Sequence, residues 1–198
     1  MGSEQILAQR AADAGTGQRI IDSVNDLIGM AKAVGADVVG CQLTEGNRKG
    51  GLTTVAEKAI GATAKAGSTP PVGFIDYGDR PSGSGLWVIP TPGRGFENLT
   101  GSAAAGATVH LFTTGLGAPE GHPLMPVIKI TGNTNTWHKL NSHMDFNVSG
   151  LIEGAETVAE AGQRLFSEVL KVASGKLTKA EVLRYDESMN ILTYGPVI

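Results

Sequence analysis

Apolar residues recur along the chain with two different periods. In some segments they return every three or four residues or form alanine-rich stretches, which predicts helices that bury one face. Gly35 and Gly67 follow two of these segments, and glycine commonly ends a helix. The predicted helices are 16–34, 52–65, 96–106, 134–141 and 155–174, with a further short one after Leu177.

Between these segments lie short runs rich in β-branched residues, which favour strands. The predicted strands are 36–41, 71–77, 85–90, 108–115 and 125–133. Strands that alternate with helices indicate an α/β fold, here a three-layer arrangement with a mainly parallel sheet covered on both faces. Ligands of such sheets bind beyond the carboxyl ends of the strands. Three polar turns are predicted to cluster at that edge, and they are 42–50, 113–124 and 131–135.

The first turn, "QLTEGNRKGG", lies between the strand predicted at 36–41 and the helix predicted at 52–65. Thr53 and Thr54 fall in the first helical turn, where unpaired backbone N–H groups attract anions. Arg48 and Lys49 could hold a carboxylate or a phosphate there. The alternative is an ordinary exposed loop with polar residues.

The second turn, "TTGLGAPEGHPLMP", begins at Thr113 and combines two hydroxyls and three glycines with Glu120 and His122. It could form a lid or a ligand cradle, or simply a long connection. A lone histidine such as His122 is more often a surface or capping residue than a ligand.

The third feature is "HMDFN", residues 143–147, together with "TGN" at 131–133. Asp145 is either a functional carboxylate or a residue that starts a turn or a helix. Spacings typical of structural zinc or calcium sites are missing from the sequence, so a metal would need scattered ligands. Cys41 is predicted to be a small core residue at the end of a strand.

Composition narrows the classes of partner. With 41% hydrophobic and 18% charged residues, the 198-residue chain is typical of a domain with a sizeable core. A net charge of −3 without a large basic cluster argues against nucleic acid. No apolar run in the sequence is long enough to span a membrane. With one cysteine, the chain cannot form an internal disulfide. We therefore predict one cytoplasmic domain over 1–198 that binds a small molecule, with residues 1–3 left from cloning.

Several motifs together resemble one enzyme family. They are "EGNRKGGLTTVAEKAIGATAKAG", "TPG", "LFTTGLGAP", "PVIKITGN", "MDFN" and "KVASG". Between Val38 and Lys179 the chain is similar to the catalytic region of the altronate/galactarate dehydratases, and the block at 45–67 is the most specific part.

The resemblance implies a Rossmann-like sheet and iron(II)-dependent dehydration of a sugar acid, such as altronate or galactarate, to a 2-keto-3-deoxy acid. Members of the family are larger, so the chain corresponds to the carboxyl-terminal portion of a catalytic domain. The missing remainder of the parent chain or a partner subunit would complete the site, and a homodimer is a further expectation.

The matching motifs suggest a role for each candidate residue. Lys49 is the first candidate for the base that removes the substrate's α-proton, and His122 is the second. Glu45 and Asp145 would contribute carboxylates to iron(II), or to another divalent metal such as manganese or magnesium. Residues expected to bind the substrate are Asn47, Arg48, Thr53, Thr54, Thr113, Thr114, Asn133 and Asn147.

Two departures from the family pattern leave the substrate open. His143 stands where an acidic residue is common, and Val148 replaces a cysteine found in some members, while Asp145 and Asn147 are retained. A related branch acts as a sulfo-lyase on sulfolactate, which is one alternative. A non-catalytic binding or assembly module is another. A nucleotide-binding protein is disfavoured because no G-x-G-x-x-G follows the first predicted strand.

Overall fold

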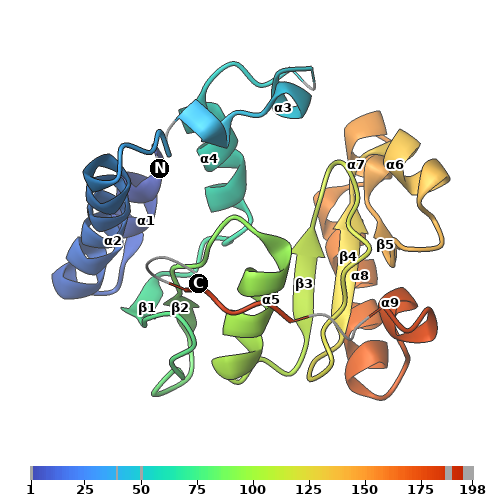
Figure 1. The fold of residues 1–198 in the computed structure, drawn as a ribbon. Coiled ribbons are helices and arrows are strands. Elements are labelled where there is room, and N and C mark those ends of the chain that lie inside the picture. Colours follow the sequence, from blue (N-terminus) through green and yellow to red (C-terminus); the bar gives the residue numbers. More distant parts are fainter. Residues whose placement is uncertain (1, 39, 50, 186–188, 194–198) are drawn as a thin grey trace. The chain divides into compact units, whose positions relative to one another are not determined.

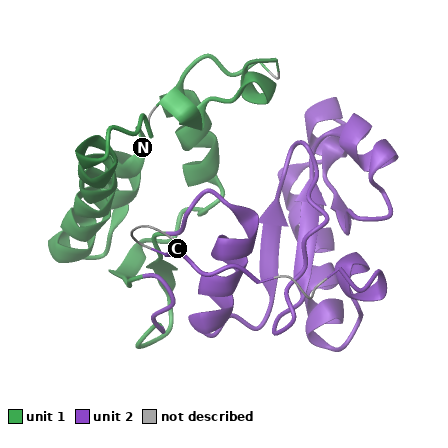
Figure 2. Ribbon diagram, viewed as in Figure 1, with its two compact units in different colours: residues 1–76, 81–90 green, residues 77–80, 91–198 purple. Residues whose placement is uncertain are grey.

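The chain folds into two compact units that both combine helices with parallel strands. The computed structural model describes residues 2–38, 40–49, 51–185 and 189–193. Unit 1 comprises residues 1–76 and 81–90, and unit 2 comprises residues 77–80 and 91–198 (Figure 2). The predicted α/β class and the parallel strand pairing are confirmed. None of the helices in the described ranges has the length and apolar character needed to cross a lipid bilayer.

Unit 1 is mainly helical and carries one pair of parallel strands. Its elements are α1 (Glu4–Arg10), α2 (Ala14–Ala33), the 3-10 helix η1 (Gly40–Gln42), α3 (Glu45–Lys49), α4 (Val55–Ala64), β1 (Pro71–Phe74) and β2 (Leu86–Val88). The carboxylate of Asp13 accepts a hydrogen bond from Thr16 N (2.9 Å) and thereby caps α2. A Cβ on Gly17 would lie 2.6 Å from Ala8 O, so a glycine is needed where α1 and α2 meet.

The prediction of a strand at 36–41 is wrong, because none of the described residues of that segment is in a strand. Val39 lies outside the described residues. The Asp37 carboxylate accepts a hydrogen bond from Gly40 N (2.7 Å), which stabilises a local turn that leads into η1. Cys41 is exposed and not part of a core, which corrects the second expectation for this segment.

Unit 2 contains a three-stranded parallel sheet with the strand order β3-β4-β5 (Figure 1). The strands are β3 (His110–Thr113), β4 (Val127–Thr131) and β5 (Phe146–Asn147). All five residues of β4 are buried, as expected for a central parallel strand covered on both faces.

Helices α5 (Gly95–Ala104) and α8 (Val158–Ala173) cover the two faces of this sheet. Leu99 of α5 packs with Val127 and Phe112, whereas Val172 of α8 packs with Ile128 and Ile130. Unit 2 thus has the expected three layers, while the more specific Rossmann-like description stays a prediction. The remaining helices of the unit are α6 (Thr134–Lys139), α7 (Ser149–Glu153) and α9 (Lys179–Val182).

A buried ion pair lies inside this sheet. Lys129 of β4 is 0% exposed, and its Nζ lies 3.2 Å from Oδ2 of Asp145, whose side chain is 6% exposed. The same oxygen accepts a hydrogen bond from Lys129 N (2.8 Å), and Oδ1 accepts one from Lys179 N (2.7 Å). Asp145 therefore connects β4 to the first residue of α9 and neutralises a cation that has no access to water.

We expect Asp145→Asn to destabilise the chain by about 3–5 kcal/mol, because it leaves the Lys129 ammonium buried without a counter-ion. Chemical denaturation followed by circular dichroism measures the change. Lys49→Met serves as the control, since it removes only the exposed partner of Glu45. A denaturation midpoint for Asp145→Asn equal to that of the control would contradict the structural role of this pair.

Candidate functional site

The carboxyl ends of β3, β4 and β5 carry four of the predicted substrate-binding residues. Thr113 ends β3 and Thr114 follows it, Asn133 follows β4, and Asn147 ends β5. Because β3 and β4 are parallel, with Thr113 opposite Ile130, the two turns that follow them begin at the same edge of the sheet. Thr136 Oγ1 donates to Gly115 O (2.6 Å) and ties these turns together. The predicted clustering is thus found for the two turns of unit 2.

The polar side chains at this edge stabilise the local backbone. Thr114 Oγ1 accepts a hydrogen bond from Gly117 N (3.1 Å). Asn133 Oδ1 caps α6 by accepting from Thr136 N (3.2 Å), and Asn147 Oδ1 accepts from Ser149 N (2.9 Å) at the start of α7. These bonds fix the loops and leave other donor and acceptor positions of the same groups for a ligand.

The turn 42–50 belongs to unit 1 and contains the short helix α3. Glu45 and Lys49 form an ion pair across one helical turn, with 2.7 Å between Oε1 and Nζ. Both side chains are largely exposed, as is that of Arg48. Asn47 and Thr44 bond to each other through side chain and backbone, which holds the start of the turn.

Thr53 and Thr54 lie directly before α4 and not in its first turn, because the helix begins at Val55 and not at Leu52. Thr54 Oγ1 accepts from Glu57 N (3.1 Å) and is the N-cap of α4. The Glu57 carboxylate accepts from both the backbone N–H and the hydroxyl of Thr53. These two bonds, the backbone one first, hold the pKa of Glu57 below its ordinary value. Both hydroxyls therefore stabilise the start of α4 through Glu57, without a ligand.

Lys58 has a positioning role that the sequence analysis did not assign. Its ammonium donates to Gln42 O and to Asn47 Oδ1 (3.0 Å), so α4 is bonded to the turn that precedes α3. Its place in the sequence could have indicated this role, because Lys58 lies within the block at 45–67 that carries the most specific part of the family resemblance.

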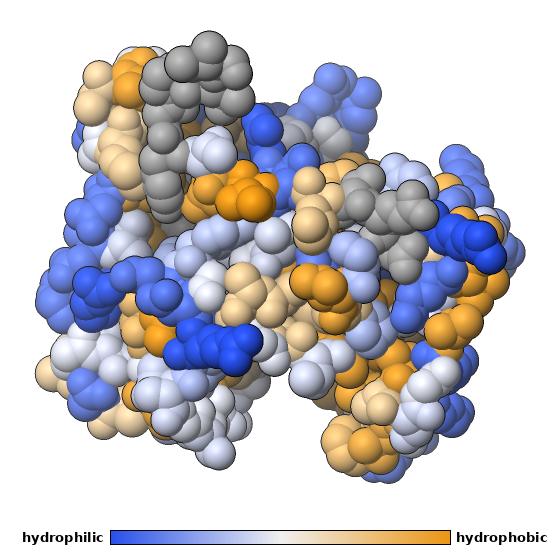
Figure 3. Space-filling model, turned by 60° about the horizontal axis from the view of Figure 1, so that its bottom comes forward, coloured by the Kyte–Doolittle hydropathy of each residue, from blue (hydrophilic) through white to orange (hydrophobic). Residues whose placement is uncertain are grey.

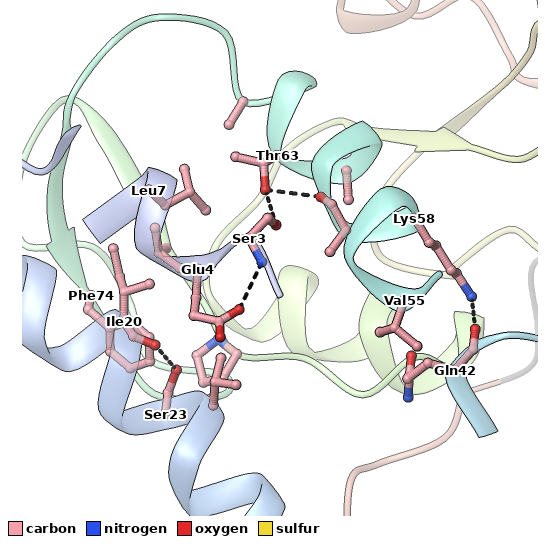
Figure 4. Close-up of a pocket in the computed structure, with 16 residues that line it drawn as sticks. Ser3, Glu4, Leu7, Ile20, Ser23, Gln42, Val55, Lys58, Thr63 and Phe74 are labelled. Carbon is pink, nitrogen blue, oxygen red and sulfur yellow. Dashed lines mark hydrogen bonds between the residues drawn. The ribbon is translucent and has the colours of Figure 1, made fainter. Parts of the chain in front are cut away.

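A pocket of about 390 Å³ lies within unit 1 (Figure 4). Apolar side chains such as Leu7, Ile20 and Phe74 form most of its wall. Among the polar residues that line it, Ser3 and Thr63 bond to each other through their hydroxyls (2.6 Å). The ammonium of Lys58 bonds to Gln42 O at the other side. This lining suits an apolar group better than a sugar acid.

The predicted metal ligands Glu45 and Asp145 lie in different units. Both oxygens of Asp145 accept hydrogen bonds from backbone N–H groups, and Glu45 is paired with Lys49. The described residues contain no group of three His, Cys, Asp or Glu side chains able to hold a metal ion. They therefore do not fit a resident metal by themselves, and coordination by Glu45 and Asp145 stays a prediction that requires further donors.

His122 is buried, with 3% of its surface exposed. It lies near His110, the first residue of β3, whereas Thr113 and Thr114 lie at the other end of that strand. Burial lowers the pKa of both imidazoles, and at His110 the neighbouring His122 contributes as well. Within unit 2 the structure thus separates His122 from the hydroxyls and amides at the carboxyl edge.

A parallel α/β unit with polar groups at the carboxyl edge of its sheet is typical of enzymes that bind small molecules. Comparison with known proteins narrows this class. Residues 1–196 match the family model described as D-galactarate/Altronate dehydratase, C-terminal, and the chain belongs to this family.

Relatives with known names agree with this assignment. The chain is 36% identical over 190 residues to the (2R)-sulfolactate sulfo-lyase subunit beta of Chromohalobacter salexigens, which covers 94% of this chain and 48% of the relative. It is 36% identical over 174 residues to the galactarate dehydratase (L-threo-forming) of Escherichia coli, covering 86% and 32%. It is 34% identical over 181 residues to the altronate dehydratase of Bacillus subtilis, covering 91% and 36%. The chain thus spans about a third to a half of these relatives.

We expect the stability of the chain to fall as the pH decreases from about 7.5 to about 5, because the unfolded chain binds protons on these histidines more readily than the folded one. The stabilisation is complete above the ordinary histidine pKa of 6.5 and is lost as the pH falls through the lowered values. Denaturant midpoints measured across this range test the expectation. The loss should shrink in His110→Gln and persist in His138→Gln, an exposed control. A midpoint independent of pH would contradict it.

We also expect the 198-residue chain to retain far less than one equivalent of iron(II) after anaerobic incubation and desalting, because three protein ligands are not assembled in its described part. Elemental analysis measures the bound metal. Stoichiometric retention by the unsubstituted chain would contradict this expectation.

Proposed function

We propose that the chain forms the carboxyl-terminal part of a hydro-lyase that removes water from a sugar acid such as altronate or galactarate. The observation that carries the proposal is the family match over residues 1–196, together with relatives named as dehydratases of these acids. The polar groups at the carboxyl edge of the unit 2 sheet support it, since hydroxyl and amide groups suit a polyhydroxylated substrate.

Dehydration of a hydroxy acid requires a group that takes the α-proton and a group that helps the β-hydroxyl to leave. Lys49 is held in an ion pair with Glu45, where it acts as a cation. This pairing supports a role in carboxylate binding, in which the substrate carboxylate competes with Glu45 for the ammonium. A base role requires Lys49 to leave the ion pair.

The metal expected from the resemblance, iron(II), remains part of the proposal with donors from outside the described residues. The described residues do not assemble a metal centre by themselves. Each unit is proposed to contribute groups that bind a substrate. In unit 1 these are Asn47, Arg48, Thr53 and Thr54, and in unit 2 they are Thr113, Thr114, Asn133 and Asn147.

Exposed apolar side chains support a further polypeptide partner. Figure 3 shows orange, apolar residues at the surface of the face drawn. In unit 2, Phe166 and Leu170 of α8 are 58% and 52% exposed, and in unit 1 Met30 of α2 is 48% exposed. Such surfaces mark interaction sites. We propose that the remainder of the parent protein or a partner subunit covers them, with a homodimer as the alternative.

A sulfo-lyase is the second candidate function, favoured by the 36% identity over 94% of the chain to a subunit of such an enzyme. The two functions share proton removal beside a carboxylate and differ in the leaving group. Activity measured on altronate, galactarate and (2R)-sulfolactate separates them, because dehydration yields a 2-keto acid and cleavage of the carbon–sulfur bond releases sulfite.

The test uses the full-length gene product under anaerobic, iron-replete conditions, with the 198-residue chain assayed beside it. Turnover of a sugar acid by the full-length protein supports the proposal. Turnover by neither protein on any of the acids would favour a binding or assembly module.

The role of Lys49 can be separated kinetically in the full-length enzyme. Lys49→Arg keeps the positive charge but cannot act as a base. If Lys49 binds the carboxylate, kcat should remain within a few-fold and KM should change. If Lys49 is the base, kcat should fall roughly 10²-fold or more. Lys32→Arg, at an exposed position of α2, is the matched control. Exchange of the substrate's α-proton with solvent, measured by NMR, should persist in the first case and vanish in the second.

A further inference from the structure

Four buried polar atoms in the described part of unit 2 have no hydrogen-bond partner, namely Oε2 of Glu120, Nε2 of His122, Nζ of Lys129 and Nδ1 of His143. Lys129 is balanced by its ion pair with Asp145. Glu120 and His122 are two residues apart in the connection between β3 and β4. A buried polar group without a partner is destabilising, so such groups are usually satisfied by a ligand or an ordered water. Neither Glu120 Oε2 nor His122 Nε2 has a role in the contacts that hold the fold.

Glu120 lies close to the start of α5 and to β3. It belongs to the irregular part of the connection between β3 and β4, where residues 117–122 form no helix, strand, turn or bend. A Cβ on Gly95, the first residue of α5, would lie 3.4 Å from Glu120 Oε1 and 3.7 Å from the ring of Phe112. Glu120 therefore lies against the face of β3 that packs toward α5.

His122 faces the same part of β3. It interacts electrostatically with His110, and the rings of His110 and Phe112 lie 6.2 Å apart. Since His110 and Phe112 are two residues apart in a strand, they share one face. Glu120, His122 and His110 thus line one polar region between the start of α5 and β3.

The hydrogen bond at the other ring nitrogen determines what His122 can bind. Nδ1 accepts from Leu124 N (3.3 Å), so in the neutral ring the proton is on Nε2. The buried Nε2 is then a donor, which cannot coordinate a metal in this form. The Glu120 carboxylate is an acceptor. A hydroxyl group can accept a hydrogen bond from His122 Nε2–H and donate one to the Glu120 carboxylate.

We propose that Glu120 and His122 form a binding site for a hydroxyl group on the α5 side of β3, with His122 Nε2–H as the donor and Glu120 Oε2 as the acceptor. The hydroxyl belongs either to an ordered water or to a polyhydroxylated acid. The second source rests on the proposed function, whereas the site itself does not.

Side-chain ¹H–¹⁵N correlation spectra of the ¹⁵N-labelled 198-residue chain test the site without any assay of activity. We expect His122 to carry its proton on Nε2 and that proton to exchange with solvent much more slowly than the ring protons of the exposed His138. Glu120→Leu should abolish this protection by removing the acceptor. A proton on Nδ1, or exchange as fast as that of His138, would overturn the proposal, and both are measured on the unsubstituted chain.

Addition of galactarate and of adipate, the same six-carbon diacid without hydroxyls, distinguishes the two sources. A shift of the His122 resonance with galactarate alone assigns the site to a hydroxyl of the acid. A protected resonance that neither acid shifts assigns it to an ordered water. A shift with both acids shows a response to carboxylate and counts against a hydroxyl site.

Discussion

The buried contact between Lys129 and Asp145 is the constraint on which unit 2 depends. A charged side chain in the middle of a fully buried strand is tolerated only with a counter-ion. Asp145 supplies it and also accepts hydrogen bonds from the backbone of β4 and of α9. The ammonium of Lys179 in turn donates to Asn141 O and Met144 O and lies over the ring of Trp137. This network fixes the segment that leads into β5 and so places Asn147 at the edge of the sheet.

The candidate residues belong to two kinds of scaffold, one in each unit. In unit 2 the polar residues follow parallel strands and are held by caps of α6 and α7. In unit 1 the polar residues belong to short helical turns that Lys58 and Glu57 hold through side-chain bonds. The chain belongs to a dehydratase family yet spans only part of its named relatives.

Periodicity predicted most of the long elements because burial on one face determines them. Helices α2, α4, α5 and α8 and strands β1 to β4 fall within or close to the predicted ranges. The strand predicted at 36–41 failed because the Asp37 side chain competes for backbone N–H groups, which a count of apolar residues ignores. The helix predicted at 52–65 begins three residues later, at Val55, because the Thr54 side chain caps it. The sequence analysis did not predict the ion pairs of Glu45 and Asp145, because they depend on neighbours brought together by the turn of α3 or by the sheet.

Gly17 connects the packing of unit 1 to the size of its pocket. A methyl group at this position would collide with the carbonyl of Ala8, so any larger residue must push α1 away from α2. The pocket is lined by Ser3, just before α1, by Leu7 on α1 and by Ile20 on α2. The width of that pocket therefore depends on Gly17, which does not line it. A protein engineer could widen the pocket by substituting Gly17 without altering any residue of its wall.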